Sequence, residues 1–339
     1  MRLILLIISG ILSLFYSAAV FAASTCYSED YFPSVVKIEE TDNGFRVNLG
    51  GKFHRDIREK TLSSDTTLSL VYIDTDGWKA GETVPCKGTG CINWSDWIRQ
   101  CGGVEMPEIV LPRKEAVVLR PHLKEAWEIE QKVSACTEHS GYVWFGIGFY
   151  EGEGVDGVGG LGRYNPKTKK MEIRRPKLLR DSSINQIAHA GDSLWLGTTG
   201  YYECTGIPPT HGLVRYDWDS GKVKSFEGAD DGPCGFVIHG LLWREDYLWV
   251  ATDLGLSRWD SKKNIWENYL PDPGAKPPMR KTSCETLYAD LLNLLPRDID
   301  GGGDMGSYYS LLFDSLVKFR PQFVKKYDKA KPQRNDGTK

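Results

Sequence analysis

Apolar and polar residues alternate over short stretches along most of the chain, a pattern typical of half-buried β-strands. In the middle of the chain one such pattern occurs three times. Each copy has a strand-like segment containing a tryptophan, and Trp144, Trp195 and Trp249 are spaced by 51 and 54 residues. Each copy then resumes with the motif Gly-Leu-x-Arg-aromatic-Asn/Asp, which begins at Gly160, Gly212 and Gly255. Self-similarity at this period, with four short strands per copy, predicts propeller blades.

The second copy carries the clearest form of the motif. Its segments Leu194–Thr198 (LWLGT) and Gly212–Asp217 (GLVRYD) resemble the propeller repeats in sensor regions of bacterial two-component regulators. They are also similar in outline to streptogramin-lyase-like propellers. The resemblance covers residues 128–272 and implies a β-propeller. Three blades cannot close a ring, which needs at least four, so the flanking segments are expected to supply divergent blades.

The flanks differ in character. Residues 23–127 are β-rich, and they predict either divergent blades or a separate small β domain, with strands over 34–38, 45–49, 68–73 and 116–120. Residues 273–283 form a breaker-rich linker, 284–328 a tail of two helices, and 329–339 a disordered end. We therefore predict an all-β protein, a β-propeller with three clear blades and other divergent ones, preceded by a β-rich region and followed by a short helical segment.

The N-terminus has the pattern of a secretory signal. Arg2 precedes an apolar run, and small residues lead to Ala22, where cleavage is expected. Residues 1–22 are therefore assigned to a signal peptide. The alternative is a retained membrane anchor, but the apolar stretch is short and no positive stop-transfer cluster follows it. We expect an exported protein of the periplasm or extracellular space, with no membrane span after cleavage.

Composition narrows the class of protein. With 41% hydrophobic and 26% charged residues the chain is expected to fold, and its net charge of -3 gives no case for binding nucleic acid. All eight cysteines follow the signal segment, which predicts disulfides. Cys86 and Cys91 could pair with each other or outward to Cys101. A zinc site is the alternative, although no second close pair of ligands completes it.

Unequal loops supply the main functional clue. From the tryptophan to the Gly-Leu motif the third copy takes six positions, whereas the first takes 16 and the second 17. In a propeller these inserted loops share a face with the connections between blades, and we call it the insertion-bearing face: residues 149–158, 180–181, 201–211 and 229–236. The candidate binding residues on it are Tyr201, Tyr202, Arg180 and Asp181. A disulfide between Cys204 and Cys234 is predicted to make this face rigid.

Other residues on this face are candidates for chemistry. Glu151, Glu153 and Asp156 could offer oxygen ligands to calcium, the one cofactor considered; the alternative is a solvated loop. His211 and His239 are candidate general acids or bases, with Asp230, Asp231 or Glu203 as helpers. No nucleophile motif of the Gly-x-Ser-x-Gly type occurs.

The recurring residues are interpreted as structural. The repeat tryptophans are expected in the blade cores. The repeat arginines, Arg163, Arg215 and Arg258, are expected to form hydrogen bonds between strands or blades.

Three functions are compared. We favour an exported propeller that binds a protein or a glycan through the insertion-bearing face, without catalysis of its own. The alternative is a propeller lyase or hydrolase using acidic and histidine side chains on that face, with a divalent cation. A third is a scaffold whose C-terminal helices dock a partner.

Overall fold

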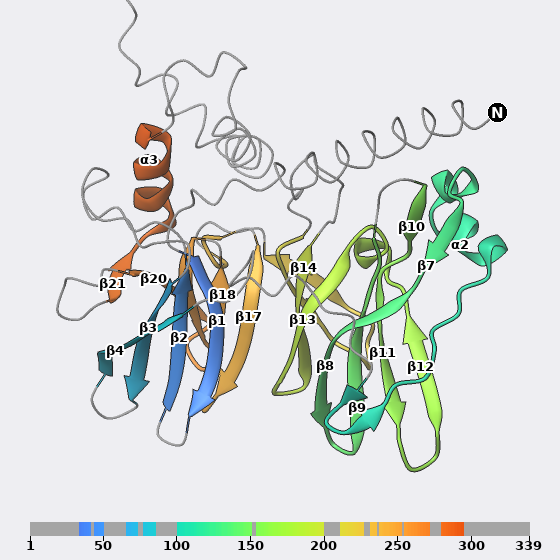
Figure 1. Ribbon diagram of the computed structural model, residues 1–339, viewed down its shortest axis with the longest axis horizontal. Helices are drawn as coiled ribbons and strands as arrows, with labels where there is room; N and C mark the ends of the chain where they lie inside the picture. The colour runs from blue at the N-terminus through green and yellow to red at the C-terminus, as the bar shows by residue number, and fades with distance from the viewer. Residues whose placement is uncertain are drawn as a thin grey trace, which may run out of the picture.

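The structure is a computed structural model. It describes residues 34–41, 44–50, 66–73, 77–85, 100–150, 154–199, 211–226, 231–235, 237–252, 254–271 and 279–294. The signal segment 1–22 and residues 295–339 lie outside this part of the chain. The described residues are mostly β-strand, arranged as several antiparallel sheets (Figure 1). No helix in them is long and apolar enough to cross a membrane.

Each of the three repeats forms an antiparallel sheet with strands in chain order, the arrangement of a propeller blade. The first sheet contains β8 (Lys132–His139), β9 (Tyr142–Gly148), β11 (Gly160–Asn165) and β12 (Lys170–Arg174). The second contains β13 (Ser183–Ala190), β14 (Ser193–Thr199), β15 (Leu213–Tyr216) and β16 (Val223–Phe226). The third contains β17 (Ile238–Arg244), β18 (Tyr247–Thr252), β19 (Gly255–Asp260) and β20 (Ile265–Pro271).

The third sheet extends beyond the predicted end of the repeats. A fifth strand, β21 (Met279–Thr282), pairs with β20 inside the segment predicted to be a linker. The segment predicted to be a breaker-rich linker, 273–283, therefore contains a strand at 279–282. The helix α3 (Cys284–Leu294) follows directly, where apolar spacing predicts a helix.

The N-terminal region contains a further sheet that follows the same plan. Its strands are β1 (Ser34–Thr41), β2 (Gly44–Gly50), β3 (Thr66–Ile73) and β4 (Gly77–Pro85). The first strand pair of each of the four sheets has a register shift at an equivalent place: Val35/Lys37, Val133/Ala135, Ile184/Gln186 and Ile238/Gly240. The N-terminal sheet therefore shares its strand order and the position of its bulge with the three repeats.

The N-terminal sheet packs beside the last repeat, so the spatial order is first, second, third and N-terminal sheet (Figure 1). At each junction an isoleucine of one sheet lies against a glycine of its neighbour. Ile184 fills the space over Gly146, and Ile238 the space over Gly197. At the third junction Ile38 of β1 lies over Gly240. A Cβ on any of these glycines would come within 3 Å of the isoleucine, so the close approach requires glycine.

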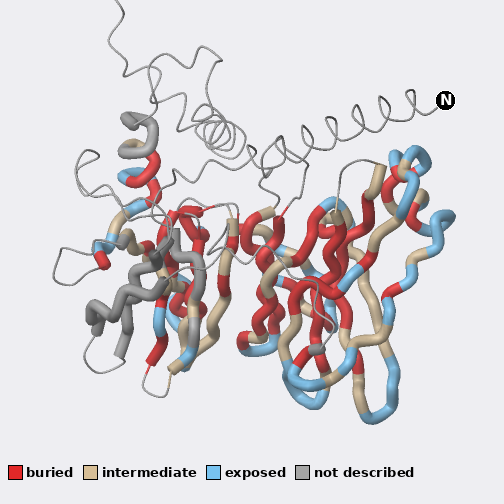
Figure 2. Tube along the Cα trace, in the orientation of Figure 1, coloured by how far each residue is buried: buried red, intermediate tan, exposed pale blue. Residues whose placement is uncertain are grey.

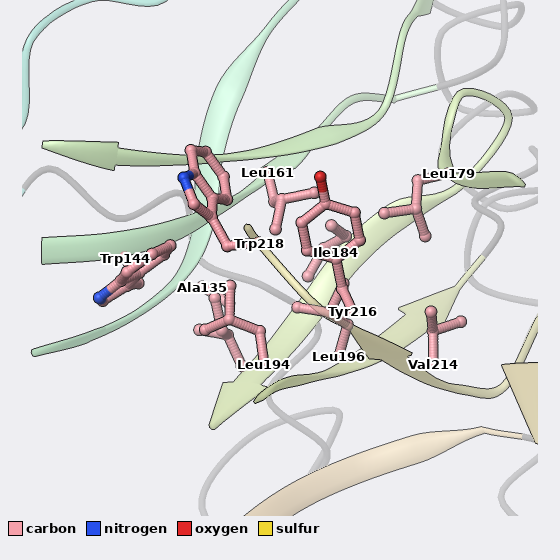
Figure 3. Close-up of a cluster of buried hydrophobic side chains, with 11 residues drawn as sticks. Ala135, Trp144, Leu161, Leu179, Ile184, Leu194, Leu196, Val214, Tyr216 and Trp218 are labelled. Carbon is pink, nitrogen blue, oxygen red and sulfur yellow. The ribbon is translucent and has the colours of Figure 1, made fainter. Parts of the chain in front are cut away.

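The repeat tryptophans are core residues, as predicted. Trp144, Trp195 and Trp249 are 6%, 0% and 3% exposed. Figure 3 shows Trp144 and Trp218 in the cluster between the first and second sheets, with Ile184 beside them. Buried positions run through the strands, and exposed ones gather at hairpin turns and around residues 110–125 (Figure 2).

The rest of the repeat motif has a direct structural use. The repeat arginines lie over aromatic rings, as Arg163 does over Tyr142 at 4.9 Å. The motif's final Asn or Asp closes the next turn: Asp260 Oδ1 accepts hydrogen bonds from the backbone N–H groups of Lys262 and Lys263, both at 3.0 Å. These turns are the Asx type that the sequence favours.

Two further predictions are wrong. Residues 116–120 are not a strand, because α2 (Arg113–Leu119) occupies most of that segment between Pro112 and Pro121, with Ala116 buried and Val118 80% exposed. The pairing of Cys204 with Cys234 is also wrong: Cys234 is bonded to Cys284, at a Cα–Cα distance of 5.1 Å. The chain returns along β21 and brings Cys284, at the start of α3, to this position.

A second disulfide joins Cys101 to Cys136. It fixes the hairpin of β5 (Gln100–Cys101) and β6 (Val104–Glu105) to β8. The predicted alternative of an outward pair from the Cys86/Cys91 loop to Cys101 is therefore wrong, while Cys86, Cys91 and Cys204 lie outside the described residues. Two disulfides fit an exported protein.

Candidate functional site

The candidate site is built where the repeat is interrupted. The loop inserted after β9 contains the short strand β10 (Val155–Gly157), which pairs in parallel with β7 (Glu128–Glu130) from before the first repeat. The segment α2 and the 3-10 turn η1 (Pro121–Lys124) precede β7. Ala116, Leu123 and Val158 form a small buried cluster that joins these pieces. Figure 1 shows α2, β7 and β10 together at one edge of the first sheet.

A buried ion pair lies at the centre of the site. Arg120 Nη1 is 2.7 Å from Asp156 Oδ1, and the two side chains are only 7% and 10% exposed. Asp156 Oδ1 also accepts the backbone N–H of Gly157 at 2.6 Å. The other carboxylate oxygen, Oδ2, lies 3.0 Å from Nε2 of His122. Asp156 therefore connects a buried arginine with a histidine whose side chain is 57% exposed.

A second acid–histidine pair adjoins this network. His211 Nε2 lies 3.7 Å from Asp181 Oδ1, an ion-pair distance longer than a direct hydrogen bond. His211 lowers the pKa of the Asp181 carboxyl, an effect that burial opposes and that the charge of Arg120 reinforces. Because Arg120 acts on both carboxylates, we treat Arg120, His122, Asp156, Asp181 and His211 as one polar cluster.

An exposed tryptophan lies against Gly154, two residues before Asp156. Trp127 is 81% exposed, and it is the most exposed large apolar side chain among the described residues. The backbone N–H of Trp127 donates to the carbonyl of Gly154 at 2.6 Å, and the indole ring occupies the space over the Gly154 Cα. Arg113 of α2 donates to the carbonyl of Trp127 at 2.5 Å. The backbone around Trp127 is thus held from two sides while most of the side chain faces solvent.

The sequence-predicted residues have different outcomes. The structure brings Asp181 and His211 together. Asp156 is buried rather than solvated, and its oxygens contact Arg120, His122 and the backbone N–H of Gly157. Asp231 is exposed and forms an ion pair at 3.6 Å with Lys224, a residue of β16. Within the described ranges no three His, Cys, Asp or Glu side chains form a metal site.

His239 has a structural position. It is the bulged residue of β17, equivalent to Ser134 of β8 and Asn185 of β13. Ser134 and Asn185 each donate a side-chain hydrogen bond to the first strand of the next sheet, and Asn185 reaches the carbonyl of Ile238 at 2.8 Å. Burial lowers the pKa of His239 to about 4, so its imidazole is neutral at about pH 7 and is a weak base.

The remaining candidates lie elsewhere. Arg180 packs at the junction, where its Nε donates to the carbonyl of Arg175 at 3.0 Å. The predicted residues Glu151, Glu153, Tyr201, Tyr202, Glu203 and Asp230 lie outside the described residues.

Sequence reasoning missed Arg120, His122 and Trp127. All three belong to the segment before the first repeat, where the apolar run 116–120 suggested a strand. Pro112 and Pro121 are a signal that could have corrected this, since proline favours the ends of helical segments.

Comparisons with known proteins give only distant similarities. The chain matches no protein-family model and no curated protein. Among solved structures it is similar to the extracellular domain of the putative one component system BT4673 from B. thetaiotaomicron, with 15% identity, a TM-score of 0.30, and coverage of 68% of this chain and 28% of the other. A GH74 xyloglucanase from Xanthomonas campestris has 11% identity and a TM-score of 0.30, with coverage of 67% of this chain and 28% of the other. YjhT has 9% identity and a TM-score of 0.29, with coverage of 74% of this chain and 69% of the other.

The chain thus spans about 28% of the length of the first two structures. Similarity at this level assigns neither a family nor a function to it.

Proposed function

We propose that this is an exported binding protein that recognises a glycan through its insertion-bearing face, at the surface around Trp127. The observation that carries the proposal is the exposed indole of Trp127, held in place beside a fixed polar cluster. A flat apolar ring can cover the C–H face of a sugar, and prearranged polar groups can then bind its hydroxyls. A protein ligand is the other outcome that the test below can return.

The proposed scaffold is a β-propeller in which the described sheets are blades. The shared bulge and the isoleucine–glycine junctions support this assignment. Export is supported by the signal-like N-terminus and by the two disulfides.

The test is binding of the mature, oxidised protein to an array that carries immobilised polysaccharides and immobilised proteins. Trp127→Ala should weaken binding to the recognised glycan about 30-fold, because loss of a central aromatic contact costs about 2 kcal/mol. Ile265→Ala is the matched control: it removes another exposed apolar side chain, 46% exposed, at the start of β20. Equal binding by wild type and Trp127→Ala, or binding only to proteins, would overturn the proposal.

A catalytic function is the second candidate, because His122 is hydrogen-bonded to a buried carboxylate. Such a carboxylate orients an imidazole and fixes which ring nitrogen is exposed, as a general base of a lyase or hydrolase requires. If the protein is an enzyme, His122→Ala should abolish turnover of the bound glycan while leaving binding within about threefold. Release of no product by the wild type, measured as new reducing ends or unsaturated sugars, leaves binding as the function.

A further inference from the structure

A strongly basic segment lies beside the polar cluster. Residues 174–180 (RRPKLLR) contain four basic residues and no acidic one, in a chain whose net charge is -3. They connect the first sheet to the second through the 3-10 turn η2 (Lys177–Leu179). Arg174 stacks on Trp218 at 4.2 Å and is part of the packing between the two sheets. The other three basic residues are Arg175, Lys177 and Arg180.

The Arg175 guanidinium is fixed in position by backbone groups. Its Nη1 donates to the carbonyls of Val158 and Gly159. The Arg175 side chain lies directly over Gly160, where an added Cβ would come within 3.0 Å of Arg175 Cγ. The carbonyl of Arg175 in turn accepts a hydrogen bond from Arg180 Nε. The segment therefore holds Arg175 in one orientation across the start of β11.

One edge of this guanidinium remains available to a ligand. Within the described part of the chain, Nε and Nη2 of Arg175 form no hydrogen bond, and neither atom is fully buried. Nε and Nη2 form the side of the fork that binds a carboxylate or sulfate with two parallel hydrogen bonds.

Arg175 also has no carboxylate partner among the described residues. Burial lowers its pKa to about 10, and Glu115 of α2 offsets this only through space. Lys177 and Arg180 likewise form no ion pair with a carboxylate in the described ranges. A partly buried cation without a counter-ion is stabilised by an anion that binds to it.

The helix α2 links this cation to Trp127. Arg113 in its first turn holds the Trp127 carbonyl, and Glu115 in the same turn is the acidic group that acts on Arg175. We propose, building on the proposed glycan-binding function, that the ligand is an acidic polysaccharide, whose anionic group binds the Nε/Nη2 edge of Arg175 while a sugar ring covers Trp127. Lys177 and Arg180 add positive charge at the same place.

The experiment measures affinity of the mature protein for polygalacturonate, heparin, neutral dextran and poly-L-glutamate. We expect binding to polygalacturonate or heparin, weakening as NaCl rises from about 50 to about 500 mM, with dextran bound at least about tenfold more weakly. Polygalacturonate and heparin distinguish a carboxylate from a sulfate as the anionic group.

The variants separate geometry from charge. Arg175→Lys keeps the charge but loses the fork, and it should weaken binding about tenfold. Lys177→Gln should weaken it about two- to threefold. Lys170→Gln makes the same charge change at the opposite end of β12, on a side chain that is 73% exposed, and should have no effect. Thermal unfolding of each variant confirms that it is folded.

Each other outcome identifies which proposal fails. If dextran binds as tightly as the acidic polymers and Arg175→Lys and Lys177→Gln match the wild type, the acidic-ligand inference is wrong while glycan binding stands. If poly-L-glutamate binds as tightly as the polysaccharides, the site selects charge alone and the inference is also wrong. If no polysaccharide binds, the proposed function itself is wrong.

Discussion

Removal of the Asp156 carboxylate tests how the candidate site is held together. Arg120 and Asp156 are 7% and 10% exposed and 2.7 Å apart, so Asp156→Ala removes a buried carboxylate from contact with a buried guanidinium. Breaking a buried pair in this way costs about 3–5 kcal/mol of unfolding free energy. For a domain of this size that corresponds to a fall in Tm of roughly 6–20 °C.

The assay is urea unfolding of wild type, Asp156→Ala, and the double variant Arg120→Met/Asp156→Leu. Apolar replacement of both partners removes both buried charges, so the double variant should recover most of the loss, to within about 2 kcal/mol of wild type. His122→Ala is a local control at a side chain that is 57% exposed, and it should cost less than about 1 kcal/mol. An Asp156→Ala protein as stable as wild type, or one whose loss depends on EDTA or calcium, would refute the ion-pair interpretation.

Two further predictions concern the sheets. Burial opposes ionisation of Glu267, but hydrogen bonds from Lys281 and Arg258 prevail and lower its pKa to about 2; its ionised form therefore stabilises the fold above about pH 4.5, and this contribution is lost as pH falls toward 2. Glu267→Gln should lower the unfolding free energy by about 1–2 kcal/mol at about pH 7, after allowance for partial solvation. In a series of urea unfolding experiments, the difference from wild type should shrink between about pH 4.5 and 2. A difference that does not change with pH would contradict this prediction. Gly197→Ala should lower the unfolding free energy by about 1–3 kcal/mol, because the alanine Cβ would come within 2.9 Å of Ile238. An alanine variant as stable as wild type in the same assay would show that the junction can relax.

The repeat made most of the fold readable from the sequence. The tryptophan and Gly-Leu-x-Arg positions recur because each sheet uses them for the same contacts, as Asp260 does in closing the turn after β19. The N-terminal sheet was ambiguous because it lacks those residues. What it shares with the repeats is the strand order and the bulge at Val35/Lys37, which no residue pattern encodes on its own.

The candidate site was much less predictable. Loop lengths drew attention to Asp156, Asp181 and His211, but not to the residues that contact Asp156. The charge of Asp156 suggested a solvated ligand because its counter-ion, Arg120, is 36 residues away and comes into range only when β10 pairs with β7. Long-range pairing of this kind leaves no local signal. The same holds for Cys234, whose partner Cys284 is 50 residues further along.

The position of these residues explains why a repeated scaffold can carry a single site. A contact made by the repeat motif recurs in every sheet and so serves stability, as the repeat arginines do over their aromatic rings. Arg120, His122 and Trp127 lie before the first repeat, and Asp156 lies in an insertion, so none has a counterpart in the other sheets. Substitutions there can change the ligand while the junctions between sheets keep their packing. In the proposed function, recognition therefore depends on residues outside the repeat motif, and the Arg120–Asp156 pair is the one among them whose loss is also expected to lower stability.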